Sequence, residues 1–144
     1  MTESLTDLIR RADLYLDTPA QSERYTELGE DFYNFFGSDQ KRVSSQVRNL
    51  QQIVVSARRL GDIEAFVKNQ MGKATGSQQW RQIGESVLEH LKLLRKKADE
   101  LSADEVQRLP LRLHLAREWV RTVVGAYLYA KALNEMQKEK SDNV

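Results

Sequence analysis

Apolar side chains recur along this chain at intervals of three and four residues, the period of an α-helix with one buried face. No segment shows the apolar–polar alternation of a β-strand, and only two prolines and seven glycines interrupt the 144 residues. The spacing predicts helices over residues 5–16, 22–36, 44–60, 63–73 and 78–101. A further helical stretch follows, strongly apolar over residues 111–136. The pattern therefore predicts an all-α fold, a single-domain helical bundle of about five to seven helices.

Residues that favour helix ends mark most of the predicted boundaries. Pro19 ends the first helix, because proline disfavours helical geometry in the residue before it. Gly37 can adopt the left-handed backbone conformation that often ends an α-helix. At Gly61-Asp62 the glycine is expected to end one helix and the aspartate to cap the next. Residues 74–77 are predicted to form a loop. Residues 102–105 have the spacing of a capping box, so a new helix begins there, with Pro110 near the start of the next helix or kinking a continuous one.

The predicted helix over 44–60 has two unlike sides, because each residue advances by about 100°. One side is apolar and holds Val43, Val47, Leu50, Val54 and Ala57. The opposite side is polar and holds Arg48, Gln52, Ser56 and Arg59. We therefore expect a basic stripe that faces away from the core.

The last helical stretch carries a wider apolar face. Its central stripe comprises Trp119, Val120, Val123, Tyr127, Ala130 and Leu133. The stripe is widened by Leu113, Leu115, Val124 and Leu128. Such breadth predicts contacts on more than one side.

Length and composition narrow the class of protein. A chain of 144 residues can bury a core of its own without metal or disulfide. The absence of cysteine excludes a disulfide framework and a thiolate metal site, and is typical of a reducing compartment. No run approaches the roughly 18 uninterrupted apolar residues of a membrane span, and the N-terminus lacks the pattern of a leader. We therefore expect one soluble, cytoplasmic domain over residues 1–144, with residues 138–144 frayed.

Charge is distributed unevenly although the net charge is only +1. Residues 1–39 hold three basic and nine acidic side chains, whereas residues 40–81 hold eight basic and two acidic ones. The local net charge therefore changes from −6 to +6 between neighbouring segments. A helical surface with clustered Arg and Lys attracts polyanions such as nucleic acid.

The candidate nucleic-acid-binding residues belong to this basic segment. They are Lys41, Arg42, Arg48, Gln52, Arg58, Arg59, Lys68, Lys73 and Arg81. Trp80 is the one nearby aromatic that could stack on a base, so the composition favours contact with the phosphate backbone over reading of base sequence. The alternative is a solvated helical face whose charge is balanced by the acidic segment, residues 1–39.

Catalytic, cofactor and metal motifs are not evident in the sequence. His90 and His114 are 24 residues apart and lack the neighbouring ligands of a zinc site. Residues 72–77 resemble a phosphate loop, but Val67 and Ala74 stand where a Walker motif needs glycine and a hydroxyl. The acidic side chains near the N-terminus, including the pair Glu23 and Glu27, are expected on a solvated face. We therefore expect no cofactor and no enzymatic activity.

Two parts of the chain resemble a known family. Ser44-Ser45-Gln46-Val47-Arg48-Asn49-Leu50 opens a helix, and Glu118-Trp119-Val120 and Gly125-Ala126-Tyr127-Leu128 follow late in the chain. Over about residues 40–133 the pattern resembles the small helical subunit of type III CRISPR effector complexes, which serve antiviral defence. The resemblance implies a non-catalytic all-α subunit, repeated along a ribonucleoprotein filament, that holds guide and target RNA. It also implies that Arg48 contacts RNA.

Together these patterns predict an RNA-backbone-binding helical subunit of a larger complex, with RNA and other protein subunits as partners. The main alternative is a protein-interaction or adaptor bundle that self-associates as a homo-oligomer and binds no nucleic acid. An enzyme is the third possibility, and it requires a polar cleft that unites His90 or His114 with Glu118.

Overall fold

The computed structural model describes residues 3–35, 40–73 and 78–142, with the side chains of residues 40–44 and 78 left outside the description. The described chain forms six helices: α1 (Leu5–Leu16), α2 (Pro19–Phe35), α3 (Gln40–Ser56), α4 (Leu60–Gly72), α5 (Gln78–Leu101) and α6 (Glu105–Asp142). These residues contain no β-strand. The predicted all-α, single-domain bundle is therefore confirmed.

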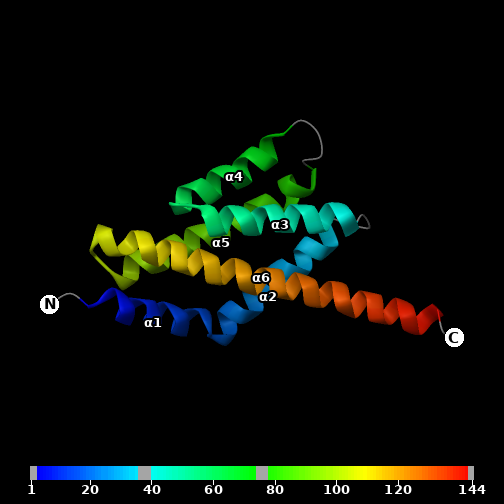
Figure 1. The fold of residues 1–144 in the computed structure, drawn as a ribbon, viewed down its shortest axis with the longest axis horizontal. Helices are drawn as coiled ribbons and strands as arrows, with labels where there is room; N and C mark the ends of the chain where they lie inside the picture. The colour runs from blue at the N-terminus through cyan, green and yellow to red at the C-terminus, as the bar shows by residue number, and fades with distance from the viewer. Residues whose placement is uncertain (1–2, 36–39, 74–77, 143–144) are drawn as a thin grey trace.

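The longest helix, α6, is the axis on which the bundle is built. It contacts each of the other five helices. In Figure 1, α1 lies along the first half of α6, whereas α3 and α4 lie on the opposite side. Among the described residues, α1 contacts α2, α5 and α6 but neither α3 nor α4. No helix in the described ranges is both long and apolar enough to span a bilayer.

The core follows the predicted apolar faces over most of the chain. The predicted inward residues Val47, Leu50, Val54 and Ala57 of the α3 region are buried. The apolar stripe of α5, from Ile83 to Leu101, is also buried. In the first part of α6 the stripe begins at Leu111 and includes Trp119, Val123 and Tyr127.

Helices α2 and α6 approach each other closely at Gly29. A Cβ atom added there would lie 2.6 Å from both the Ala126 Cβ and the Val123 carbonyl oxygen, and 2.8 Å from the Tyr127 nitrogen. Distances this short cannot be relieved by a side-chain rotation, because two of the three atoms belong to the α6 backbone. The lack of a side chain at this position therefore allows the two helices to pack.

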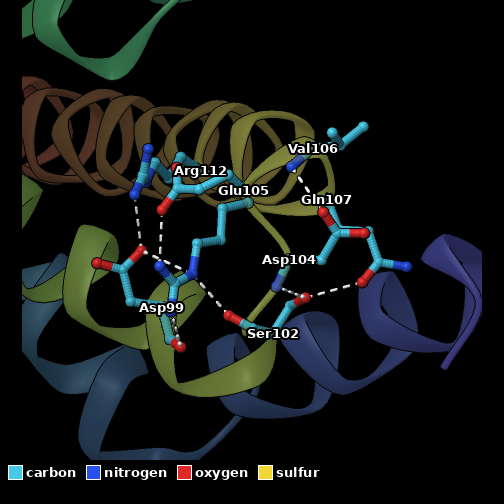
Figure 2. A network of polar contacts seen from close by, with 8 residues as sticks. Asp99, Ser102, Asp104, Glu105, Val106, Gln107 and Arg112 are labelled. Carbon is cyan, nitrogen blue, oxygen red and sulfur yellow. Dashed lines mark hydrogen bonds and ion pairs between the residues drawn. The ribbon is translucent and has the colours of Figure 1, made fainter. Parts of the chain in front are cut away.

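A polar network fixes the turn between α5 and α6 (Figure 2). Asp104 Oδ1 accepts a hydrogen bond from the Val106 nitrogen at 2.9 Å, which caps the start of α6. Ser102 Oγ accepts from the Asp104 nitrogen at 3.1 Å and donates to Gln107 Oε1 at 2.7 Å. The predicted helix start is confirmed in this region, with Asp104 as its cap.

Two arginines of α6 strengthen the same turn. Arg112 Nη2 donates to Asp99 Oδ1 at 2.8 Å, and Arg108 Nε donates to the Ser102 carbonyl oxygen at 2.6 Å. Asp99 belongs to the last turn of α5 and Ser102 directly follows this helix, so the first turns of α6 are tied to the end of α5. Pro110 lies inside α6 and does not begin a separate helix.

Several predicted helix ends differ from the structure. α3 spans Gln40–Ser56, whereas the sequence predicted 44–60, and α2 begins at Pro19, a residue well suited to the first helical position. Gly61 does not stop a helix but lies inside α4. The predicted frayed end at 138–144 is helical as far as Asp142. Gly37 and the predicted loop 74–77 lie outside the described residues.

The second half of α6 is the largest departure from the predicted core. Leu133 was expected in the central stripe and Leu128 beside it, yet their exposed fractions are 40% and 53%. In Figure 1 this end of α6 extends beyond the neighbouring helices, so little of the bundle remains to cover it. Apolar periodicity therefore continues past the part of α6 that the chain itself can bury.

Candidate nucleic-acid interface

The outer face of α3 carries the predicted stripe as far as Ser56, so that it includes Arg48 and Gln52 but not Arg59. Val47, Leu50 and Val54 are buried on the inner side, and Arg48 and Gln52 are exposed on the opposite side. Within the described residues, the Arg48 guanidinium makes no hydrogen bond or ion pair. Lys41 and Arg42 belong to the same helix, but their side chains lie outside the described residues.

The turn between α3 and α4 places two arginines differently from the prediction. Both were expected on the third helix, which in fact ends at Ser56. Arg59 is the N-cap residue of α4, and its Nη2 donates to Asp62 Oδ1 at 3.1 Å. Arg58 is exposed, and within the described ranges it is engaged through its backbone nitrogen alone, which donates to Asp62 Oδ2 at 3.3 Å. The positive charge of Arg59 is thus partly compensated, whereas no carboxylate among the described residues pairs with Arg58.

The pKa of Asp62 reflects this arrangement. Partial desolvation tends to raise the pKa of its carboxyl, but the hydrogen bond and charge of Arg59 and the backbone donors at Arg58 and Arg59 outweigh that effect. The net result is a pKa below the usual aspartate value. Asp62 therefore stays ionised and holds the turn that presents Arg58.

The remaining predicted contacts lie toward the other end of α4. Lys68 and Lys73 are exposed. Arg81 is exposed too, but its Nε donates to the Met71 carbonyl oxygen at 3.2 Å and its Nη2 to the Lys73 carbonyl oxygen at 3.5 Å. These bonds satisfy carbonyl groups at the end of α4, a structural task that the sequence did not reveal. Since α4 is 13 residues long, about 20 Å separates Lys73, at the far end of this helix, from the α3–α4 turn.

Trp80 does not serve as a stacking platform. Its side chain is 1% exposed, and its Nε1 donates to Gln46 Oε1 at 2.9 Å. The rings of Phe32 and Phe66 meet it edge-on, with centroids 6.2 and 6.0 Å away. The prediction that it could stack on a base is therefore wrong, because its indole completes the core between α2, α4 and α5.

The acidic segment does not neutralise the basic residues in the described part of the chain. Its ion pairs join Glu3 to Arg11, Asp7 to Arg10 and Asp13 to His114. Among the described residues, no ion pair joins a carboxylate of residues 3–35 to a cation of residues 45–81. The arrangement is consistent with the lack of contact between α1 and either α3 or α4. The Arg48–Gln52 stripe is therefore available to an external anion.

Arg117 of α6 adds a cation that sequence reasoning missed. Its Nη2 lies 3.5 Å from the carbonyl oxygens of both Val55 and Ala57, at the end of α3 and next to Arg58. About sixty residues separate Arg117 from these acceptors, and no local pattern marks it. We call the surface formed by Arg48, Gln52, Arg58, Arg59 and Arg117 the α3 basic surface.

Of the two histidines, His90 lies in the core, whereas His114 lies one helical turn before Glu118 on α6. His90 is 8% exposed, and its Nδ1 accepts a hydrogen bond from Trp119 Nε1 at 3.3 Å. Burial, aided by the charge of Arg24, lowers the pKa of His90 to about 4. His114 Nε2 lies 2.7 Å from Asp13 Oδ1, and Glu118 pairs with Arg121. The structure therefore keeps His90 away from the surface, whereas Asp13, the partner of His114, lines the same open depression as Glu118.

The described residues also contain no cluster of three or more His, Cys, Asp or Glu side chains placed to hold a metal ion. Comparison of the chain with protein-family models, with curated proteins and with solved structures finds no match.

Proposed function

We propose that this chain is a non-catalytic, RNA-backbone-binding helical subunit of a ribonucleoprotein complex. The contact surface is the α3 basic surface. The observation that carries the proposal is the exposure of Arg48 and Gln52 opposite a buried apolar face, together with the lack, among the described residues, of compensating carboxylates from α1 and α2.

The chemistry of this surface favours phosphate as the group recognised. Guanidinium groups donate charge-assisted hydrogen bonds to phosphate oxygens, and Gln52 can donate to phosphate or sugar oxygens. Trp80, the aromatic residue that the sequence offered for stacking on a base, is buried. Binding is therefore expected to depend strongly on salt and weakly on base sequence.

The resemblance to the small helical subunit of type III CRISPR effector complexes is part of the proposal. It assigns Arg48 to RNA, and the exposed position of Arg48 on α3 is compatible with that role. In such a role the chain would bind other protein subunits as well as guide and target RNA in the cytoplasm.

The test is a titration of a mixed-sequence single-stranded RNA at several salt concentrations. Replacement of both Arg48 and Arg58 by Ala removes two uncompensated cations and leaves the Arg59–Asp62 pair intact. We expect the double variant to bind RNA about tenfold more weakly at low salt. The slope of log affinity against log salt should fall by about 0.7 for each phosphate that the variant no longer binds.

The matched control is Arg10→Ala/Arg11→Ala, which removes the same charge from α1, a helix that does not contact α3. This control should keep most of the RNA affinity. Equal affinity of the wild type and the Arg48→Ala/Arg58→Ala variant, or an equal decrease in the control, would contradict the proposed surface.

A protein-interaction module is the second candidate function, and one observation favours it. The second half of α6 exposes several large apolar side chains, including Leu128, Tyr129 and Met136. Such residues on one side of a projecting helix are typical of a protein contact.

A further inference from the structure

The second half of α6 carries a row of apolar and small residues on its outer side. At 100° per residue these side chains fall within one sector of the helix, away from the inward-facing Val123 and Tyr127. We call this row the outer strip; it comprises Gly125, Leu128, Tyr129, Ala132, Leu133 and Met136. The exposed fractions are 53% for Leu128, 67% for Tyr129 and 54% for Met136. The strip is therefore an apolar surface that the described chain leaves uncovered.

Gly125 gives the strip room for a close neighbour. A Cβ atom added at Gly125 would meet nothing within 4 Å, so this side of α6 is open. Near Ala126, another side of α6 is in tight contact with Gly29 of α2. α6 thus has a glycine contact with α2 on one side and an open glycine position on the other. A second helix could approach the outer strip at Gly125.

The strip continues toward α1 into an open depression with a volume of about 610 Å³. The depression is bounded on the α6 side by Glu118 and Thr122 and on the α1 side by Leu14. Leu14 is 71% exposed, so this end of the surface is also partly apolar. One continuous surface therefore runs from Leu14 along α6 to Met136.

We propose that this surface binds a second copy of the chain, with the two α6 helices antiparallel and a twofold axis close to Tyr129. In this register Gly125 lies opposite Leu133 of the other copy, whose side chain fills the open position. Thr122 then lies opposite Met136, and Glu118 opposite Lys140. The C-terminal end of each α6 enters the depression beside Leu14 of the other copy.

Charge selects a second copy in this direction. Residues 118–140 span about 34 Å of helix, with Glu118 at one end and Lys140 at the other. An antiparallel copy places the Glu118–Arg121 pair of each chain beside Lys140 and Glu139 of the other, so that opposite charges meet at both ends of the dimer. A parallel copy would oppose Glu118 to Glu118 and Lys140 to Lys140. The surface is therefore self-complementary only when the helices are antiparallel, as a twofold interface requires.

The first test measures the mass of the full chain by sedimentation equilibrium over a range of concentrations without nucleic acid. We expect a monomer–dimer equilibrium for the wild type. Tyr129→Glu should raise the dimer dissociation constant at least about tenfold, since it places two carboxylates at the axis. Val106→Glu is the matched control, because Val106 is 81% exposed on the same helix but lies outside the strip. That control should dimerise like the wild type.

The second test uses charge exchange to identify the register. Glu118→Lys alone and Lys140→Glu alone should each weaken the dimer, because each opposes like charges across the interface. The double variant Glu118→Lys/Lys140→Glu should restore the wild-type dissociation constant. Restoration supports the antiparallel second copy, since binding of an unrelated protein would not require the two exchanges to compensate.

Three results would overturn the proposal. The first is a wild-type chain that stays monomeric at every concentration, which would leave the strip to a different partner. The second is a dimer that Tyr129→Glu does not weaken. The third is a double charge exchange that remains as weak as the single variants. None of these results depends on RNA binding, so these experiments test the dimer independently of the α3 basic surface.

Discussion

Helices α2 and α3 both pack against α6, but they do so by different means. α2 meets α6 through Gly29 at backbone distance, whereas α3 presents Val47, Leu50 and Val54 as ordinary apolar side chains. Their outer faces differ as well, since α2 exposes Glu23 and Glu27 and α3 exposes Arg48. The comparison separates two properties of the molecule: the inner faces determine how tightly each helix is held, and the outer faces determine which ligand charge is attracted.

The two buried tryptophans show the same contrast. Trp119 donates to His90, which also lies near the ring of Tyr25 in α2, with centroids 5.8 Å apart. Trp80 donates to Gln46 of α3, an acceptor that does not titrate. The Trp119–His90 contact beside α2 therefore depends on pH, whereas the Trp80–Gln46 contact beside α3 does not.

The largest effect is expected from Gly29→Ala. The added methyl group would overlap the α6 backbone at 2.6 Å, so α2 and α6 must separate or the backbone must shift. We expect a decrease of about 3 kcal/mol in the free energy of unfolding, measured by urea denaturation.

Gly84→Ala is the matched comparison for this prediction. The three heavy atoms nearest to the added methyl group there all belong to the Met71 side chain, with its Sδ at 2.4 Å from the added atom. A flexible thioether can move aside, so the expected decrease is about 1 kcal/mol or less. Equal decreases in the two variants would show that the α2–α6 approach is not especially tight.

The next effect concerns pH and His90. The pKa of His90 is lowered to about 4 in the folded chain, from an ordinary value of 6.5 in the unfolded chain. Between these two values the unfolded state binds more protons, so the contribution of His90 to stability is constant above about pH 6.5 and falls as the pH decreases toward 4. The expected decrease in stability from pH 7 to pH 5 is about 2 kcal/mol.

His90→Gln should flatten this pH dependence, because glutamine stays neutral while it can still accept from Trp119. The control is His114→Asn, which changes the histidine that pairs with Asp13 at the surface. It should keep the destabilisation by acid that His90 causes. A His90→Gln variant that is destabilised by acid as steeply as the wild type would show that His90 is not responsible.

The smallest effect is expected from the acidic face of α2. Burial raises the pKa of Asp31, and the neighbouring charges of Glu27 and Glu30 raise it further. The carboxylates of this face therefore already repel one another. Glu23→Gln/Glu27→Gln should change the free energy of unfolding by less than about 0.5 kcal/mol. RNA affinity should rise by less than about twofold at physiological salt, because exposed charges are screened over about 8 Å. A larger rise in affinity would place α2 beside the bound RNA.

The helices could be predicted from sequence wherever local signals act alone. The bounds Leu5–Leu16 and Gln78–Leu101 agree with the prediction, because their apolar period and end residues are local. The end of α3 was predicted wrongly. Gly61 and Asp62 suggested that the helix ends at residue 60, but it ends at Ser56 and is followed by a turn at residues 57–59. That turn is held by the Asp62 carboxylate, which accepts from two backbone nitrogens before it in the chain.

The candidate site was predictable only in part, for the same reason. The helical period placed Arg48 and Gln52 opposite the core, and the structure confirms their exposure. Trp80 and Arg117 could not be assigned, because the burial of one and the position of the other depend on residues far away in the chain. The exposed second half of α6 follows the same rule: its apolar spacing is visible in the sequence, but what lies opposite it is not.

The contacts of α6 with every other helix have a consequence for biosynthesis. α6 is the last of the six described helices in chain order, so a ribosome translates α1 to α5 before their common support exists. Until Trp119 and Val123 leave the exit tunnel, the sides of α1 to α5 that pack on α6 stay uncovered, and only the contacts among these five helices can form. We therefore expect nascent chains that end before α6 to remain unfolded and open to chaperones.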